Sequence, residues 1–244
     1  MIRLDVKLCE VGMFETRTKA QRAVKDKCVA VNGKIVSKPS ILVADTDEIT
    51  LVSEPLKYVS RGALKLVEAN NKFNIDFTDK VVLDIGASTG GFTEVALENG
   101  AKKVYALDVG SDQLHPKLHQ DKRVVSMEQT NFRYSKTSDF DDLIDLCVTD
   151  VSFISLKLIL PPLKDILSLN GYGIVLIKPQ FEAGKKALNK HGVCRDKKIH
   201  KKVIDDIVDF TKDLGFQIID LCDSPILGGE GNQEYLMYIK KTTD

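Results

Sequence analysis

Two lysines and two carboxylates, far apart in the sequence, stand where apolar or amphipathic segments could bring them together: Lys65, Asp150, Lys178 and Glu234. Asp150 and Lys178 each end an apolar segment, and Glu234 begins the last one. In a doubly wound α/β fold, ligands bind at the edge of the sheet where the parallel strands end. An antiparallel strand starts at that same edge, and a helix carrying Lys65 can pack over it. Although each residue alone is more often a surface charge, their joint placement predicts one shared site.

This set of side chains suits proton removal from a hydroxyl group. An alcohol is a poor nucleophile at neutral pH and must lose its proton as it is methylated. A lysine with its ordinary pKa of about 10.4 is mostly protonated, but burial and a neighbouring cation lower that pKa, whereas carboxylates raise it. We assign Lys178 as the base and Lys65 as the neighbouring cation. Asp150 and Glu234 would orient the lysines, and the set predicts methylation of a sugar hydroxyl.

A glycine-rich stretch, residues 84–93, joins an apolar run to a helical pattern and predicts a cofactor site. Its spacing differs from the Gly-x-Gly-x-x-Gly that cradles a dinucleotide, which disfavours NAD. Asp108, 22 residues after Gly86, would accept the ribose hydroxyls of an adenosine, and residues 128–131 could reach its base. An adenosine without phosphates fits S-adenosylmethionine, although a purely structural turn would also explain the glycines. The candidate cofactor-binding residues are Asp84, Gly86, Ala87, Ser88, Gly90, Gly91, Phe92, Thr93, Asp108 and Asn131.

The elements that must position these residues follow an alternating pattern from residue 60 onward. We expect strands at residues 81–85, 103–108, 124–127, 145–150, 173–178, 216–222 and 234–240, and helices at residues 61–71, 92–99 and 197–214. Continuous apolar strands that alternate with helices are typical of a mostly parallel sheet covered on both faces. No helical pattern separates the last two strands, which predicts an antiparallel hairpin. The fold class is therefore α/β, a Rossmann-like sheet of the methyltransferase kind with its last strand antiparallel.

The first 55 residues have a different pattern and predict a small α+β module. Leu4, Leu8 and Val11 recur at helical spacing before Gly12, and Thr16 is a candidate N-cap for a second helix. A strand at 29–31, an Asn-Gly turn and a strand at 34–36 then form a hairpin signal, and a further strand is expected at 47–52.

Charge distinguishes this module from the rest of the chain. Residues 17–38 hold seven basic residues and one acid, although the whole chain has 35 of each sign and no net charge. A basic face of this kind would bind RNA phosphates, while a solvated helix is the alternative interpretation. The candidate RNA-binding residues are Arg3, Arg17, Lys19, Arg22 and Lys25. We divide the chain into an RNA-binding module at 1–55, a linker at 56–59 and a catalytic domain at 60–244.

Other features of the composition point to a protein of the cytoplasm. No apolar run approaches the roughly 20 residues that a membrane span requires, and the charged N-terminus lacks the apolar core of a signal peptide. The five cysteines are scattered, without the spacing of a metal site, and fit reduced thiols. We expect no membrane partner and no metal.

Five sequence stretches carry a family resemblance: residues 60–66, 84–93, 149–155, 177–182 and 231–235. The catalytic domain resembles the ribose 2′-O-methyltransferases related to FtsJ, which have a Lys-Asp-Lys-Glu tetrad, and nearly the whole chain resembles the TlyA family, often labelled hemolysin A. The resemblance implies S-adenosylmethionine-dependent 2′-O-methylation of ribosomal RNA, free or in ribosomal subunits, at a cytidine. It also implies that the N-terminal unit is an RNA-binding module of the kind first seen in a small-subunit ribosomal protein. Arg195, in a loop beside the catalytic edge, is a further candidate RNA contact.

Four other functions remain as alternatives. A membrane-lytic protein would need a spanning or strongly cationic amphipathic segment. A pseudouridine synthase carries the same N-terminal module but needs no adenosine site. A non-catalytic RNA-binding protein would not need the tetrad. A methyltransferase acting on a base would more usually carry a cysteine nucleophile or an Asn/Asp-Pro-Pro-aromatic motif where this chain reads Asp150-Val151-Ser152-Phe153.

Overall fold

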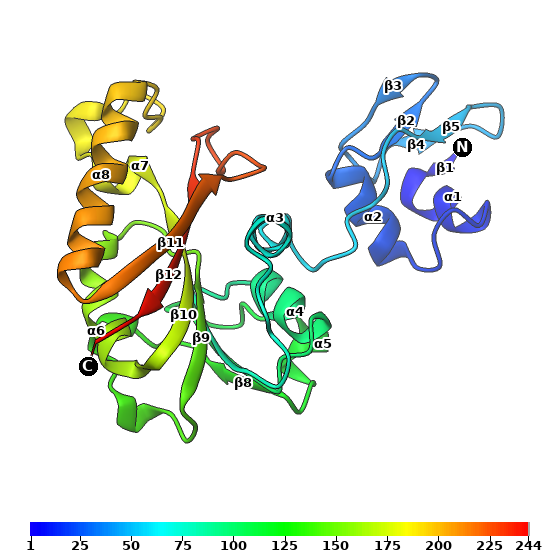
Figure 1. The fold of residues 1–244 in the computed structure, drawn as a ribbon. Helices are drawn as coiled ribbons and strands as arrows, with labels where there is room; N and C mark the ends of the chain where they lie inside the picture. The colour runs from blue at the N-terminus through cyan, green and yellow to red at the C-terminus, as the bar shows by residue number, and fades with distance from the viewer. Residues whose placement is uncertain (244) are drawn as a thin grey trace. The chain divides into compact units, whose positions relative to one another are not determined.

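The structure is a computed structural model that describes residues 1–243. The chain forms two compact units, Met1–Lys57 and a larger unit that begins at Tyr58 (Figure 1). Each unit has its own buried apolar core. No helix in the described part of the chain is both long and apolar enough to cross a membrane.

The N-terminal unit packs two helices against short antiparallel strands. Its elements are β1 (Ile2–Arg3), α1 (Leu4–Glu10), α2 (Arg17–Lys25), β2 (Val29–Val31), β3 (Lys34–Ile35), β4 (Leu42–Val43) and β5 (Ile49–Leu51). The hydroxyl of Thr16 accepts the backbone N–H of Lys19 at 3.3 Å, so the predicted N-cap of α2 is confirmed. The predicted hairpin is confirmed as well, because β2 pairs antiparallel with β3 across the Asn-Gly turn. The pairing of β1 with β4 was not predicted.

The larger unit is built on one sheet. Within residues 1–243 this sheet has seven strands in the order β11-β12-β10-β9-β6-β7-β8. They are β6 (Val81–Ile85), β7 (Lys103–Leu107), β8 (Val124–Met127), β9 (Ile144–Thr149), β10 (Leu167–Ile177), β11 (Phe216–Asp223) and β12 (Tyr235–Lys241). The neighbours from β10 to β8 are parallel, whereas β12 is antiparallel to both β10 and β11. The predicted mostly parallel sheet and its antiparallel hairpin are confirmed.

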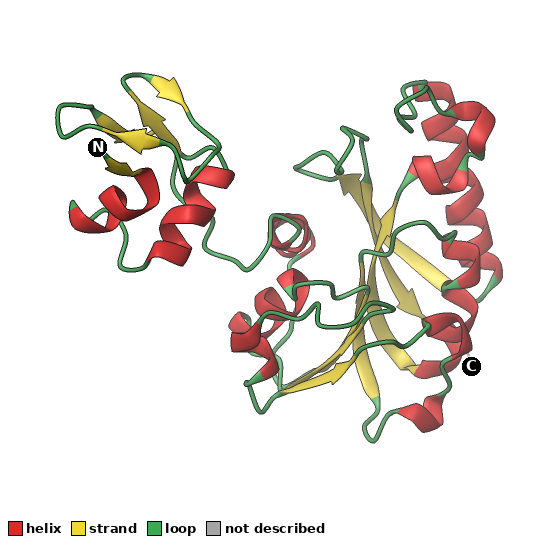
Figure 2. Ribbon diagram, turned by 180° about the vertical axis from the view of Figure 1, so that it is seen from behind, coloured by secondary structure: helices red, strands yellow, loops and turns green. Residues whose placement is uncertain are grey.

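Helices cover both faces of this sheet, as Figure 2 shows. The helices are α3 (Ala63–Phe73), α4 (Gly91–Glu98), α5 (Pro116–His119), α6 (Leu160–Ile166), α7 (Pro179–Glu182) and α8 (Lys197–Asp213), and the 3-10 turns are η1 (Phe132–Tyr134), η2 (Thr137–Asp139), η3 (Leu156–Leu158) and η4 (Lys185–Ala187). One apolar cluster joins α3, α4 and α5 to the sheet, and a second joins α6 and α8 to its other face. All five residues of β6 are buried because this strand is covered on both faces.

Several predicted element ends differ from the structure. The strand expected at 173–178 begins earlier, at Leu167, and its pairing with β9 shifts register before Tyr172. The helix expected at 61–71 starts and ends two residues later, because Gly62 precedes it and Asn74 ends it in the left-handed conformation. The first helix ends at Glu10 rather than at Val11. The strand expected at 47–52 is confined to β5.

Strand register positions the candidate site. The last residue of β6 pairs with the last residues of β7 and β9, and the last residue of β10 pairs with the first residue of β12. The residues one step beyond these pairs therefore gather at one edge of the sheet, and they are Gly86, Asp108, Asp150, Lys178 and Glu234. Four of these, Asp108, Asp150, Lys178 and Glu234, were expected inside the strands and instead lie just outside them.

Candidate active site

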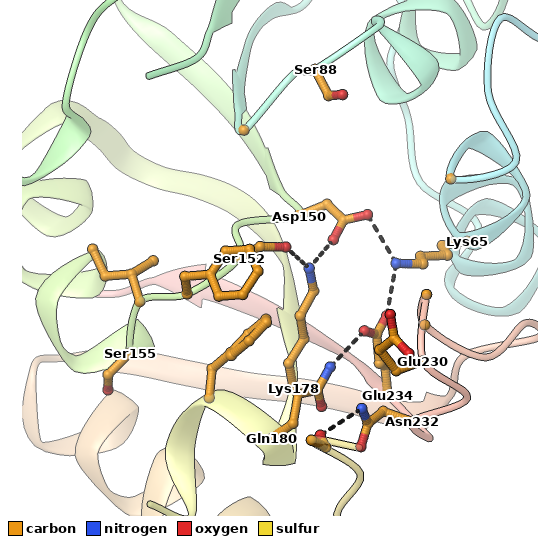
Figure 3. Close-up of a pocket in the computed structure, with 18 of the residues that line it drawn as sticks. Lys65, Ser88, Asp150, Ser152, Ser155, Lys178, Gln180, Glu230, Asn232 and Glu234 are labelled. Atoms are coloured by element: carbon orange, nitrogen blue, oxygen red, sulfur yellow. Dashed lines mark hydrogen bonds and ion pairs between the residues drawn. The ribbon is translucent and has the colours of Figure 1, made fainter. Parts of the chain in front are cut away.

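The four charged residues predicted to share a site form one chain of ion pairs (Figure 3). Lys65 Nζ donates to Asp150 Oδ2 at 2.9 Å and to Glu234 Oε2 at 2.7 Å. Lys178 Nζ lies 2.6 Å from the other oxygen of Asp150. Lys65 comes from α3, and the other three come from the ends of β9, β10 and β12, so four separate elements build the network.

Burial makes these charges depend on one another. Lys65 and Lys178 are each 6% exposed, and Glu234 is 2% exposed. Burial disfavours the charge on Lys65, but Asp150 and Glu234 outweigh it and raise the pKa of Lys65. Burial likewise disfavours the carboxylate of Asp150, yet the two lysines lower its pKa. Lys65 therefore stays a cation and Asp150 an anion at neutral pH.

The two lysines have different surroundings. Lys65 contacts two carboxylates, whereas Lys178 contacts one carboxylate and the hydroxyl of Ser152, whose Oγ accepts from Lys178 Nζ at 2.9 Å. The Lys178 Nζ atom also lies 5.7 Å from the ring centre of Phe181. Less negative charge therefore surrounds Lys178 than surrounds Lys65.

Gln180 is a further member of the network that was not predicted. Its Nε2 donates to Glu234 Oε1 at 3.1 Å. Its Oε1 is buried and has no hydrogen-bond partner among residues 1–243. Gln180 and Ser152 both lie within stretches that carry the family resemblance, but their polar contacts depend on tertiary neighbours and gave no separate signal.

The network opens onto a cavity of about 850 Å³. Its wall includes the four charged residues, Gln180 and the small residues Gly86, Ala87, Ser88 and Gly91. Gly86 has φ +83°, and a Cβ there would lie 3.0 Å from the carbonyl oxygen of Asp150. Glycine at this position therefore lets β6 turn tightly beside the end of β9.

The other predicted cofactor residues surround this wall. Asp84 is completely buried, and its Oδ2 accepts the Thr93 hydroxyl at 2.7 Å. Burial raises the pKa of Asp84 to about 7, and its Oδ1 lacks a hydrogen-bond partner in the described chain. Asp108 accepts the backbone N–H groups of Ser88 and Gly110, each at 2.8 Å.

Two of the predicted cofactor residues, Gly90 and Asn131, have local structural contacts. Gly90 has φ +93°, and a Cβ there would meet Leu118. Asn131 accepts the backbone N–H of Arg133 at 3.2 Å. Five of the predicted cofactor residues stand outside the lining of the cavity as the described residues form it: Asp84, Gly90, Thr93, Asp108 and Asn131. Phe92 does line it, at the first turn of α4.

Exposed aromatic surface at the cavity was also not predicted. Phe153 is 91% exposed, has φ +62° and lines the cavity. Its ring centre lies 5.0 Å from that of Phe181. A large apolar side chain so fully in solvent, on a backbone conformation that costs energy, points to an interaction with a ligand.

The candidate RNA-binding residues lie on the surface of the N-terminal unit: Arg3, Arg17, Lys19, Arg22 and Lys25. Two of them also form ion pairs with the buried carboxylate of Asp5. Arg3 Nε lies 2.9 Å from Asp5 Oδ1, and Arg17 Nη2 lies 3.0 Å from Asp5 Oδ2. Lys19 is paired with Glu15. These arginines thus stabilise the module as well as contributing to its charge.

Comparison with known proteins agrees with both units. Residues 58–241 match the FtsJ-like methyltransferase family, and residues 2–49 match the S4 domain. A solved structure titled putative hemolysin from Streptococcus thermophilus is 48% identical, with a TM-score of 0.80, over 99% of this chain and 89% of that one. The fold and site thus define a methyltransferase of the FtsJ-like class that carries an S4 domain.

Full-length relatives narrow the assignment. The putative rRNA methyltransferase YqxC of Bacillus subtilis is 47% identical over 97% of this chain and 85% of its own length. The 16S/23S rRNA (cytidine-2′-O)-methyltransferase TlyA of Mycobacterium tuberculosis is 38% identical over 99% of this chain and 91% of its own length. The chain belongs to the TlyA family, as the sequence resemblance predicted.

Proposed function

We propose that this chain transfers a methyl group from S-adenosylmethionine to the ribose 2′-hydroxyl of a cytidine in ribosomal RNA. The observation that carries the proposal is the buried Lys65–Asp150–Lys178–Glu234 network on the wall of the cavity. The relative from M. tuberculosis, named as a 16S/23S rRNA (cytidine-2′-O)-methyltransferase, supports the choice of nucleoside.

The residues beside the network fit an adenosine-containing methyl donor. The wall from Gly86 to Gly91 presents small side chains, so a ligand can approach the backbone closely. Asp108 stands at the end of the neighbouring strand, where a carboxylate can accept ribose hydroxyls. Asp84, two residues before Gly86, is buried outside the lining of the cavity, and its Oδ1 has no hydrogen-bond partner among residues 1–243. The proposed cofactor-binding residues remain Asp84, Gly86, Ala87, Ser88, Gly90, Gly91, Phe92, Thr93, Asp108 and Asn131. When bound, S-adenosylmethionine supplies an electrophilic methyl group.

Lys178 acts as the base in this proposal. A neutral amine has two N–H donors and one lone pair. Lys178 Nζ donates to Ser152 Oγ at 2.9 Å, and it lies 2.6 Å from Asp150 Oδ1, a carboxylate oxygen that has no hydrogen-bond partner among the described residues. The lone pair is then left for the proton of the ribose hydroxyl. As the oxygen gains the methyl group, that proton moves to Lys178 Nζ, and Asp150 balances the new charge.

Lys65 and Glu234 prepare this base. The charged Lys65 donates a hydrogen bond to Asp150 at 2.9 Å. Asp150 therefore shares its negative charge between the two lysines instead of interacting with Lys178 alone. Glu234 keeps Lys65 charged in its buried position, and Gln180 fixes Glu234. Together they limit the cost of burying the two lysines.

Phe153 supports a nucleotide as the substrate. RNA-modifying proteins stack unpaired bases on aromatic side chains, and an enzyme that acts on a nucleotide often takes it out of its helix. The exposed ring of Phe153 lies at the cavity that holds the proposed base, beside Phe181. We assign Phe153 to stack on the base of the target nucleotide.

The N-terminal module would hold the RNA. We propose residues 1–55 as the RNA-binding module, 56–59 as the linker and 60–244 as the methyltransferase domain. The basic helix would contact phosphates, so affinity should fall with salt, and shape would matter more than sequence. Ribosomal RNA, free or in ribosomal subunits, is the proposed partner, which places the protein in the cytoplasm.

Methyl transfer from labelled S-adenosylmethionine tests this function. Purified ribosomal subunits, their extracted RNA and transfer RNA would each be incubated with the full chain. We expect label in ribosomal RNA and little in transfer RNA. Absence of label from every ribosomal substrate, with S-adenosylmethionine binding shown by calorimetry, would contradict the proposal and favour a non-catalytic RNA-binding protein.

A further inference from the structure

A second concentration of positive charge lies in the larger unit. Residues 185–202, here called the basic segment, hold eight lysines and arginines and one acid. All eight cations are exposed: Lys185, Lys186, Lys190, Arg195, Lys197, Lys198, Lys201 and Lys202. The whole chain has equal numbers of positive and negative residues, so this excess is local. It is slightly larger than the excess in residues 17–38 of the N-terminal module, where seven basic residues accompany one acid, and it lies on the other unit.

The charges on α8 are arranged against the stability of the helix. Four lysines occupy its first two turns, and the acids Asp205, Asp206, Asp209 and Asp213 follow in its later turns. A helix dipole favours anions at the N-terminus and cations at the C-terminus, the reverse of this order. Within the described chain, one of the four lysines is ion-paired, Lys201 with Asp205 at 3.1 Å. Helix stability therefore does not explain the lysines, whereas an external anion would.

The basic segment is fastened to the catalytic edge. The side chain of Asn232, 4% exposed, accepts the backbone N–H of Cys194 at 2.9 Å and donates to the carbonyl of Gly192 at 3.2 Å. The buried ring of His200 bridges the carbonyl of Cys194, at 2.9 Å, and the hydroxyl of Tyr235, at 2.8 Å. Asn232 and Tyr235 flank Glu234 in the sequence, so the segment has a fixed place beside the network.

The same segment forms part of the cavity wall. Lys185, Leu188 and Gly192 line the cavity together with the four network residues. A strand whose ribose reaches Lys178 would therefore continue over the basic segment. On α8, residues four apart are neighbours on one side of the helix, so Lys197 and Lys201, and likewise Lys198 and Lys202, form adjacent pairs. Such a spread of exposed cations suits a polyanion with repeated charges better than one small anion.

We propose that the basic segment is an RNA-binding surface of the catalytic unit, which holds the phosphates that flank the target ribose. The choice of RNA as the partner rests on the proposed function. The surface is separate from the N-terminal module, so the chain carries two RNA-binding regions. The module would supply general affinity, and the basic segment would align the target strand with Lys178.

Two charge-matched double variants of the full chain test this surface. Lys197→Gln with Lys198→Gln removes two charges from the basic segment. Lys102→Gln with Lys122→Gln removes two exposed charges just before β7 and β8, at the opposite edge of the sheet. Binding of ribosomal RNA would be measured across a salt series by filter retention, S-adenosylmethionine binding by calorimetry, and folding by circular dichroism.

The expected effect follows from counterion release. Each lost phosphate contact lowers the slope of log affinity against log salt by about 0.7–0.9, so two contacts weaken binding by about 20-fold at 0.15 M salt. We expect this loss for the Lys197/Lys198 pair, with a raised KM for RNA and unchanged cofactor affinity. The Lys102/Lys122 pair should bind RNA nearly as the unmodified chain does.

Three outcomes would overturn the inference. Equal losses in both double variants would show only the effect of net charge, and wild-type affinity in the first would show that the surface does not touch RNA. Polyglutamate would be tested in the same retention assay as a model of an acidic protein. If the Lys197/Lys198 variant lost polyglutamate binding and kept its RNA binding, the partner would be an acidic protein. The binding assay does not require catalysis, so the two proposals can fail separately. If the unmodified chain transferred no methyl group, but the Lys197/Lys198 variant alone lost RNA binding, the proposed reaction would be refuted and the RNA-binding surface would stand.

Discussion

Substitution of Lys178 separates a base from a fixed positive charge. Lys178→Arg keeps a cation beside Asp150, but a guanidinium cannot give up its proton. Lys178→Met removes the charge and keeps a long side chain. A general base contributes about 10²–10⁴ in rate, which corresponds to about 3–5 kcal/mol of barrier. Both variants should therefore transfer methyl groups at roughly 1% of the wild-type rate or less.

The structure indicates that Lys178→Met will fold, and denaturant unfolding checks both variants. After Lys178→Met, Asp150 still has Lys65 Nζ at 2.9 Å as its counter-ion. The loss of stability should then stay below the roughly 3–5 kcal/mol that an uncompensated buried charge costs. Cofactor affinity should stay within about twofold, because no proposed cofactor contact is removed.

The assay is single-turnover methyl transfer with saturating RNA, so that binding and product release do not limit the rate. Calorimetry with S-adenosylmethionine and denaturant unfolding would serve as controls for site integrity and folding. If Lys178→Arg kept more than about a tenth of the wild-type rate, charge alone would explain the role of Lys178, and the base assignment would be wrong.

Three further predictions concern Ser152, which contacts this base, and two of the proposed cofactor-binding residues. Ser152→Ala removes the hydroxyl that accepts from Lys178 Nζ at 2.9 Å, and it should lower kcat about tenfold without changing cofactor affinity; rescue by Ser152→Thr would support a positioning role, and an unchanged kcat would exclude it. Asp108→Ala should weaken S-adenosylmethionine binding by about a hundredfold in calorimetry, since two hydrogen bonds to a carboxylate are lost, and wild-type affinity would show that the ribose binds elsewhere. Asp84, with its pKa raised to about 7 by burial, keeps a proton in the folded state that the unfolded state releases above about pH 4, so its contribution to stability falls as pH rises from about 4 to 7. Asp84→Asn should therefore raise the free energy of unfolding by up to about 4 kcal/mol at pH 8 and by little at pH 4, and equal differences at the two pH values would contradict this.

Local pattern was sufficient for much of the fold. Strand β6 occupies the predicted residues 81–85, because a continuous buried run bounded by charged and glycine residues has few alternatives. The Asn-Gly hairpin and the Thr16 cap are short-range signals that tertiary contacts did not change. The early start of β10 at Leu167 escaped prediction because its first five residues mix two leucines with Ser168, Asn170 and Gly171 and pair across an irregular register.

The site was harder to predict in detail. The placement of Asp150, Lys178 and Glu234 follows from strand ends, and strand order brings those ends to one edge. The contacts of Gln180 and Ser152 depend on side-chain directions that no spacing encodes. Positive charge on the N-terminal unit likewise gave no sign that Arg3 and Arg17 also neutralise a buried aspartate.

The most direct test of the central claim is the position of the methyl group on the RNA product. RNA labelled by the full chain would be hydrolysed with alkali, which cannot cleave beside a 2′-O-methyl ribose, and the fragments would be mapped by mass spectrometry. The account predicts an alkali-resistant dinucleotide that carries the label on the ribose of a cytidine, and its absence with Lys178→Arg. Label on a base, in fragments that alkali cleaves normally, would contradict it.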